Sequence, residues 1–245
     1  MVIYMITGSV INAVFIIIGT AIGMIIKGYF PEKIKDALLN ALGLVVLFIG
    51  IGGALSGGLI VNNGIIETTN TTIMIASMVI GTIIGEILNI ENALQKCGDF
   101  FERKMKRLAH ESSFSEGFVS ATLIFGIGAM AVVGALENGL TGNYNILFAK
   151  SIIDGVMSII LASTLGIGVG FAAISMLIYQ GSISLLAAFV EPYLNDLVVS
   201  QMNFVGSILI FVIGLNMLKI TKFKVGNMLP AIFIPIIWYI INNLI

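Results

Sequence analysis

The sequence predicts an all-α protein, a polytopic bundle of about eight transmembrane helices. Apolar residues make up 58% of the chain and charged residues only 10%, whereas about a quarter of the residues in soluble domains are charged. The mean hydropathy is +1.08, and several apolar stretches are about 20 residues long, enough to cross a bilayer. With 245 residues we expect one transmembrane domain over 1–245, with no room for a second, soluble one.

The apolar segments that we interpret as spans are separated by short polar stretches. They lie near 9–26, 38–61, 72–90, 117–136, 147–168, 171–190, 203–218 and 226–244. The fifth and sixth are joined by a tight turn around 169–171. An alternative count of seven merges segments in that region, but the distribution of basic residues argues against it.

Eleven of the twelve basic residues fall in loops that lie on the same side of an eight-span protein, and the twelfth is Lys150. The opposite loops, 62–71, 137–146 and 191–202, contain no lysine or arginine. By the positive-inside rule, loops 27–37, 91–115 and 219–225 are cytoplasmic, and both termini lie outside.

The cytoplasmic loop 91–115 has the pattern of a basic amphipathic helix. Its apolar residues recur at helical spacing and alternate with basic ones; they are Leu94, Cys97, Phe101, Met105 and Leu108. Such a helix is expected to lie on the anionic membrane surface, and a regulatory or partner-binding role is the sharper alternative. The net charge of −1 gives no electrostatic case for nucleic acid binding.

The fifth span carries its polar and small residues at intervals of three or four. They are Lys150, Ser151, Asp154, Gly155, Ser158, Ala162 and Gly166, which share one helix face. A lysine and an aspartate inside a membrane span are costly, so this face is a functional-site hypothesis.

Two interpretations of this face remain open. In one, Lys150 and Asp154 form a structural ion pair at i, i+4. In the other, Asp154 is the central ligand of a cation or exchanges a proton, and Lys150 modulates it, because hard cations prefer oxygen ligands. Four residues would line that site: Ser151, Ser158, Ser163 and Gln180. Asn216, late in the seventh span, is a weaker candidate that could instead serve as interhelical glue.

Glycine patterns suggest close helix packing. Gly19 with Gly23, and Gly81 with Gly85, form small-xxx-small pairs, which favour dense packing and also allow a homodimer. The segments 47–52 and 211–216 are weakly similar and would run in opposite directions, as in the inverted repeats of many secondary transporters. The fourth span, rich in small residues, could pack tightly or break, and two prolines should kink the eighth span.

A single histidine, His110, and a single cysteine, Cys97, give no metal cluster, and no nucleophile–base constellation is visible. We therefore expect no enzyme activity, no metal site and no cofactor.

Several short strings are shared with a known family. They are Glu116–Val119, Gly128–Ala131, Phe148–Ser151 with Asp154 and Gly155, Ala162–Gly166, Tyr179–Gly181 and Asn227–Pro230. Through these strings almost the whole chain resembles the YqgA/YdfK-like bacterial inner-membrane proteins. The resemblance implies a cell-membrane location, and a sodium channel or pump has been suggested for the family. It supplies no binding residues.

We therefore expect an ion channel or secondary transporter for a small ion, most simply a monovalent cation. No ATP-binding motif is present, so pumping would need an ion gradient or a partner. The alternative is a non-transporting membrane scaffold or signalling protein that acts through the basic loop 91–115.

Overall fold

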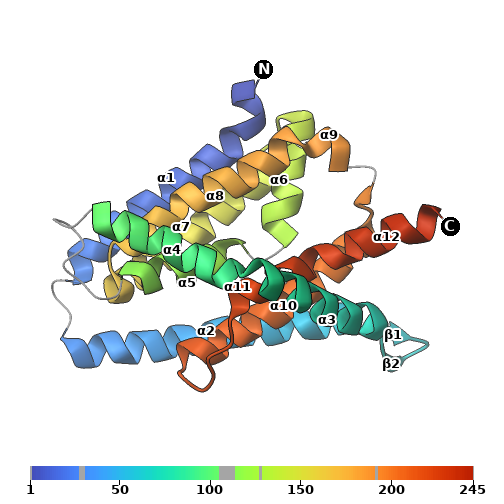
Figure 1. Cartoon of the computed structure of the whole chain (residues 1–245), viewed down its shortest axis with the longest axis horizontal. Coiled ribbons are helices and arrows are strands. Elements are labelled where there is room, and N and C mark those ends of the chain that lie inside the picture. The colour runs from blue at the N-terminus through green and yellow to red at the C-terminus, as the bar shows by residue number, and fades with distance from the viewer. Residues whose placement is uncertain (1, 28–30, 105–113, 127–128, 191–192, 245) are drawn as a thin grey trace. The chain divides into compact units, whose positions relative to one another are not determined.

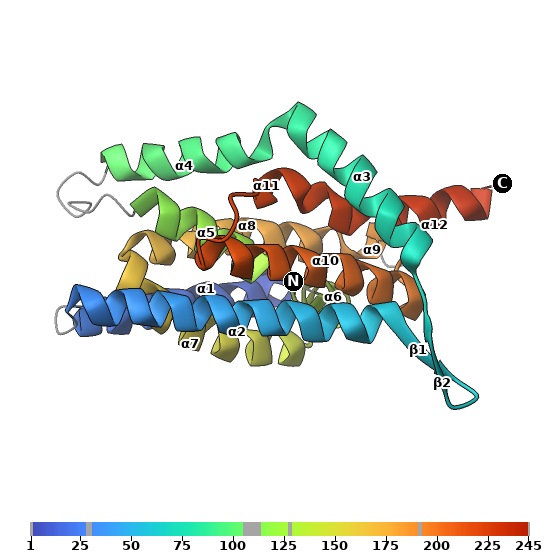
Figure 2. The ribbon, with the colours of Figure 1, turned by 90° about the horizontal axis from the view of Figure 1, so that it is seen from below.

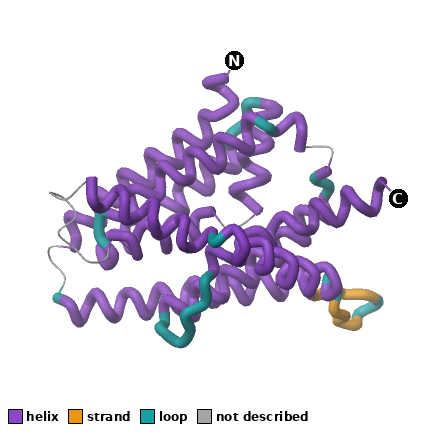
Figure 3. Tube along the Cα trace, viewed as in Figure 1, coloured by secondary structure: helices purple, strands orange, loops and turns teal. Residues whose placement is uncertain are grey.

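The computed structural model describes residues 2–27, 31–104, 114–126, 129–190 and 193–244. Helices dominate these residues, and the described strands form one short hairpin (Figure 3). The all-α fold predicted from the sequence is thus confirmed. By its internal contacts the chain divides into two compact units.

The first unit comprises Met1–Leu42, Asn92–Gly126 and Met130–Phe189. Its helices are α1 (Val2–Lys27), α4 (Ile90–Lys104), α5 (Phe114–Gly126), α6 (Ala129–Thr141), α7 (Asn145–Leu165), α8 (Gly168–Leu185) and α9 (Ala187–Val190), together with the start of α2 (Figure 1). The second unit comprises Gly43–Glu91, Ile127–Ala129 and Val190–Ile245. It holds most of α2 (Glu32–Gly58), β1 (Leu59–Asn62), β2 (Ile65–Thr68), α3 (Thr71–Leu88), α10 (Asp196–Met217), α11 (Val225–Met228), the 3-10 helix η2 (Leu229–Phe233) and α12 (Ile234–Leu244).

Fewer spans than predicted are long and unbroken. Within the described residues six helices could cross a membrane by length and composition, or seven if a bent pair counts as one span. The bent pair is the predicted fourth span, where α5 and α6 are separate helices at 82° to each other. The predicted second span has only a shorter apolar part, Gly43–Gly58, because charged residues occupy the beginning of α2.

In the first unit, α1 packs lengthwise between α7 and α8, and Figure 1 shows the three helices side by side. A Cβ atom at Gly19 would collide with the carbonyl of Gly155, and one at Gly23 with the carbonyl of Ile159. The glycines therefore let the backbones of α1 and α7 approach closely. These contacts make α1 parallel to α7, whereas Thr20 beside Gly170 and Asn12 beside Gln180 make it antiparallel to α8.

In the second unit, α2 packs antiparallel to α10 through the two segments that resemble each other. A Cβ at Gly50 would overlap Phe211, and a Cβ at Gly214 would lie 2.6 Å from the backbone nitrogen of Leu47. When the segments are aligned, Gly50 corresponds to Gly214 and Leu47 to Phe211, so the two contacts are reciprocal. A local two-fold axis between antiparallel helices produces this relationship.

The last apolar segment is interrupted as its prolines predict. The helix changes from α to 3-10 at Leu229, just before Pro230, and returns to α at Ile234, just before Pro235. Gly81 and Gly85 of α3 face this region, where added Cβ atoms would meet Ala231 and the carbonyl of Asn227. Both small-xxx-small faces are thus used inside the chain, and a homodimer would need a different surface.

A β-hairpin that the sequence did not predict connects α2 to α3 (Figure 2). Its strands pair antiparallel, with Val61 opposite Ile66, and Asn63 and Gly64 turn the chain with positive φ angles of 50° and 78°. Asn-Gly is a favoured pair for such two-residue turns.

The amphipathic helix predicted in the loop 91–115 is present as α4, from Ile90 to Lys104. A Cβ atom added at Gly98 would lie 3.2 Å from the Phe118 ring of α5, so the two helices pack closely at this point. Ser115 Oγ donates a hydrogen bond to Asp99 Oδ1. Met105, Lys106, Arg107, Leu108 and His110 lie outside the described residues.

Candidate functional site

The polar face of α7 is turned into the first unit. Its buried residues include Lys150, Ser151, Asp154, Gly155, Ser158 and Ala162, the stripe that the sequence predicts. Ile152, Ile153 and Val156 occupy the opposite face and are about half exposed. Since the apolar side chains of a membrane helix face lipid, α7 keeps its charges away from the hydrocarbon.

Lys150 and Asp154 form a buried ion pair one helical turn apart. The Lys150 Nζ atom donates to Asp154 Oδ2, and the two residues are only 6% and 5% exposed. Removing two charges from water is expensive, and their attraction offsets this cost only where further hydrogen bonds satisfy the remaining atoms. The surroundings of the pair therefore matter.

Neighbouring helices supply amide groups to this pair. The side chain of Asn12 on α1 lies beside the Asp154 carboxylate, and its Nδ2 atom donates to Gln180 Oε1 of α8 at 3.1 Å. Asn12 and Gln180 are both fully buried. A chain of polar side chains thus runs from the Asp154 carboxylate through Asn12 to Gln180, across three helices.

Three polar atoms of this region have no hydrogen-bond partner within the described part of the chain. They are Ser9 Oγ and Asn12 Oδ1 on α1 and Gln180 Nε2 on α8. Ser9 is also fully buried and lies one turn before Asn12. An unsatisfied buried polar atom costs about 1–3 kcal/mol, so these atoms favour a water molecule, an ion or another polar guest.

The serines of α7 keep their oxygen lone pairs available. Ser151 donates to the carbonyl of Leu147 at 2.6 Å, and Ser158 donates to the carbonyl of Asp154 at 2.7 Å. Each hydroxyl oxygen can therefore still accept a hydrogen bond or approach a cation. Ser163 donates to Ile160 and lies nine residues beyond Asp154, about 13 Å along the helix, so it is not next to the ion pair.

Polar contacts continue towards the beginning of α1. The backbone N–H of Gly8 donates to Asn138 Oδ1 of α6 at 3.0 Å, and Ser184 of α8 donates to the carbonyl of Ala135 at 2.7 Å. Towards the other end of these helices, fully buried apolar residues take over from the polar ones. They are Ile16, which follows Asn12 on α1, and Leu161, which follows Asp154 on α7. Beyond them the next buried hydroxyl of α1 is that of Thr20.

The seven residues predicted for the site do not all come together. Six of them belong to the first unit, namely Lys150, Ser151, Asp154, Ser158, Ser163 and Gln180, whereas Asn216 belongs to the second. There the Asn216 side chain organises the turn after α10: Nδ2 donates to the carbonyl of Phe223, and Oδ1 accepts from Phe223 N and Thr221 Oγ1.

Sequence reasoning missed Ser9 and Asn12. Both are polar residues in an otherwise apolar span, three positions apart and therefore on one face of α1. That spacing was the available signal. We call Ser9, Asn12, Lys150, Asp154 and Gln180 the polar cluster.

The string Asn227–Pro230 has a structural role in the second unit. Asn227 Oδ1 accepts from the N–H of Glu91 at 2.7 Å, and the Glu91 carboxylate accepts from the N–H of Gly226 at 2.6 Å. This reciprocal pair ties Glu91 to α11 within the second unit.

Comparison with known proteins identifies similar chains. A family model described as "Protein of unknown function (DUF554)" matches residues 7–240. The Bacillus subtilis protein named "Uncharacterized membrane protein YdfK" is 34% identical over 228 residues, which cover 93% of each chain. The Escherichia coli protein named "Uncharacterized protein YqgA" is 32% identical over 234 residues, or 94% of each chain. No solved structure matches.

Proposed function

Since the chain belongs to the DUF554 family and is a multi-pass membrane protein, we propose that it forms a pathway for a small ion. The ion is most simply a monovalent cation, Asp154 is its central ligand, and Lys150 modulates the site. The observation that carries the proposal is the polar cluster. In it a buried carboxylate and unpartnered polar atoms occur together among three apolar helices, α1, α7 and α8.

The chemistry of the polar cluster suits a cation that visits transiently. Asp154 and Asn12 Oδ1 offer oxygen ligands of the kind that hard cations prefer, and Ser9 Oγ offers another about one turn away along α1. In this structure the Lys150 ammonium is paired with the Asp154 carboxylate. An entering cation must displace this ammonium, or Lys150 must release a proton, and either step couples the occupancy of the site to the state of Lys150.

The packing directions support the alternation of the crossings on which the charge-based orientation rests. With eight crossings, the first and fifth spans run in the same direction and the sixth in the opposite one, as α1, α7 and α8 do. The second and seventh spans run in opposite directions, as α2 and α10 do. We propose that the protein lies in the bacterial inner membrane, with both termini outside and the basic loops in the cytoplasm.

Between a channel and a secondary transporter, the reciprocal contacts of α2 and α10 favour a transporter, because such transporters commonly contain inverted repeats. We propose that the protein has no enzymatic activity. The competing proposal is a membrane scaffold or signalling protein that uses the amphipathic helix α4, with the ion pair serving only as a structural pin.

The test is ion flux in vesicles reconstituted with the purified full chain, measured for sodium, potassium, lithium and protons in turn. We expect flux of at least one cation with the wild type, and Asp154→Asn should reduce it to the level of empty vesicles. Asp196→Asn is the matched control, because Asp196 is exposed at the start of α10. Absence of flux for every cation would refute the proposal, as would full flux through Asp154→Asn. Flux that responds equally to both substitutions would also contradict it.

A further inference from the structure

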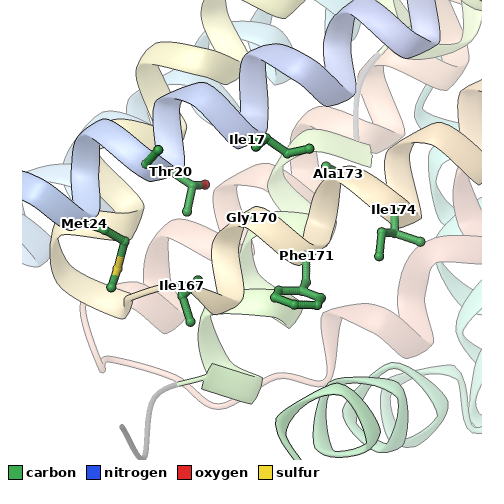
Figure 4. Close-up of a pocket in the computed structure, with 9 residues that line it drawn as sticks. Ile17, Thr20, Met24, Ile167, Gly170, Phe171, Ala173 and Ile174 are labelled. Atoms are coloured by element: carbon green, nitrogen blue, oxygen red, sulfur yellow. The ribbon is translucent and has the colours of Figure 1, made fainter. Parts of the chain in front are cut away.

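A cavity of about 430 Å³ lies in the first unit between α1 and α8 (Figure 4). It is lined by Ile17, Thr20, Ala21, Met24, Ile167, Gly170, Phe171, Ala173 and Ile174. A cavity of this volume is within the range of small-molecule sites. On α1 the cavity begins at Ile17, more than one turn beyond Asn12 of the polar cluster, and it lies towards the end of the helix that carries Lys27.

The lining excludes ions and favours hydrocarbon. No charged residue is among the lining residues, and Thr20 alone among them carries a hydroxyl group. An apolar cavity does not retain water, and a charged guest would lose its hydration without compensation. The occupant that this surface stabilises is therefore an apolar chain or ring.

The entrance of the cavity indicates where the occupant comes from. Ile17 and Ile174 line it while remaining 54% and 41% exposed. Both belong to helices long and apolar enough to cross a membrane, so their exposed faces contact lipid. The cavity thus communicates with the bilayer, whose most abundant apolar groups are the acyl chains of phospholipids.

Thr20 adds a polar requirement at one point of the lining. Its side chain faces Gly170, with Oγ1 3.4 Å from the position of an added Cβ there, and Figure 4 shows it between α1 and α8. Thr20 is only 4% exposed, and its hydroxyl has no hydrogen-bond partner among the residues that the structure describes. The Thr20 oxygen itself is covered in this conformation, so a turn of the side chain about Cα–Cβ brings the hydroxyl into the cavity, where the ester carbonyl of a phospholipid is an acceptor for it.

We propose that this cavity binds one acyl chain of a membrane phospholipid, with the Thr20 hydroxyl donating to the ester carbonyl. The acyl chain fills the apolar space between α1 and α8. The inference does not depend on ion transport, although α1 and α8 also carry Asn12 and Gln180 of the polar cluster.

The site can be mapped by photo-crosslinking in vesicles of phosphatidylethanolamine and phosphatidylglycerol. A small fraction of the phosphatidylglycerol carries a diazirine in its acyl chain, and the crosslinked residues are identified by mass spectrometry. We expect crosslinks concentrated at 17–24 and 167–174. Ala21→Phe, which places a ring in the cavity from an exposed position, should remove this concentration. Ile22→Phe is the matched control, because Ile22 is also exposed on α1 but does not line the cavity.

A second comparison tests the hydrogen bond. A diester lipid should compete for the site about fivefold better than its diether analogue, which lacks the carbonyl, since one neutral hydrogen bond has about this value. Thr20→Val should abolish the preference while the crosslinks at the cavity persist. Crosslinks spread evenly over all apolar helices would overturn the proposal, as would equal yields for Ala21→Phe and Ile22→Phe. Equal competition by the two lipids with the wild type would overturn the role of Thr20.

Discussion

Replacing Lys150 with methionine would remove the ammonium group that neutralises Asp154 inside the first unit. Because both residues are less than a tenth exposed, the single substitution leaves a carboxylate buried without its counter-charge. Removing one partner of a buried pair typically costs about 3–5 kcal/mol of stability. Asp154→Asn leaves the ammonium unpaired in the same way and should cost a similar amount.

The double variant K150M/D154N should be much more stable than the two single effects predict. It buries neither charge, so we expect a loss of about 1 kcal/mol or less. The coupling free energy, which is the sum of the single losses minus the double loss, is then about 5 kcal/mol or more. Unfolding in mixtures of mild detergent and sodium dodecyl sulfate measures all three variants. Additive losses would refute the conclusion that the pair is buried and mutually neutralising.

The same double variant separates a structural role from a transport role. If the pair is only a structural pin, the folded double variant should behave as the wild type does in the vesicle assay. If Asp154 is the ligand of a transported cation, the double variant should be folded and inactive. A stable and fully active double variant would rule out the ion pathway through Asp154.

Three further substitutions test the second unit, two of them its packing and one the role of Asn216. Gly85→Ala should destabilise the protein by about 1–3 kcal/mol, because the new methyl group would overlap the backbone carbonyl of Asn227, which cannot move aside alone. Gly52→Ala is the control, since nothing lies within 4 Å of its new Cβ. It should be neutral or slightly stabilising in the same unfolding titration. Asn216→Ala should cost about 1–3 kcal/mol through its three lost loop hydrogen bonds and leave vesicle flux per folded molecule unchanged, whereas a selective loss of flux would place Asn216 in the pathway.

Most helices could be predicted from the sequence because apolar length and charge placement report directly on membrane crossing. The predicted span 147–168 corresponds to α7, Asn145–Leu165, and the predicted span 203–218 lies within α10, Asp196–Met217, apart from its last residue. The predicted span 38–61 reaches beyond the end of α2 at Gly58. Its last residues, from Leu59 onwards, form β1, because hydropathy does not distinguish an apolar strand from an apolar helix.

The candidate site was predictable only in part, for a similar reason. The spacing of Lys150 and Asp154 within one helix is a local property, so their pairing follows from the helix itself. The hydrogen bond from Asn12 to Gln180 depends on which spans become neighbours, and one sequence does not contain that information. Asn216 illustrates the same difficulty, since its partners are formed by a turn whose conformation could not be foreseen.

The hydrogen bond between Asn12 and Gln180 joins residues 168 positions apart, and α2 and α3 of the second unit are encoded between them. During synthesis α1 therefore enters the bilayer with Ser9 and Asn12 unshielded, well before the ribosome has made α7 or α8. Polar side chains exposed to lipid are costly, so the nascent chain needs a temporary companion for α1, such as the insertion machinery or other early helices. Assembly of the first unit is thus a late event in biogenesis, and truncation before α8 should leave a chain that is inserted but vulnerable to membrane proteases.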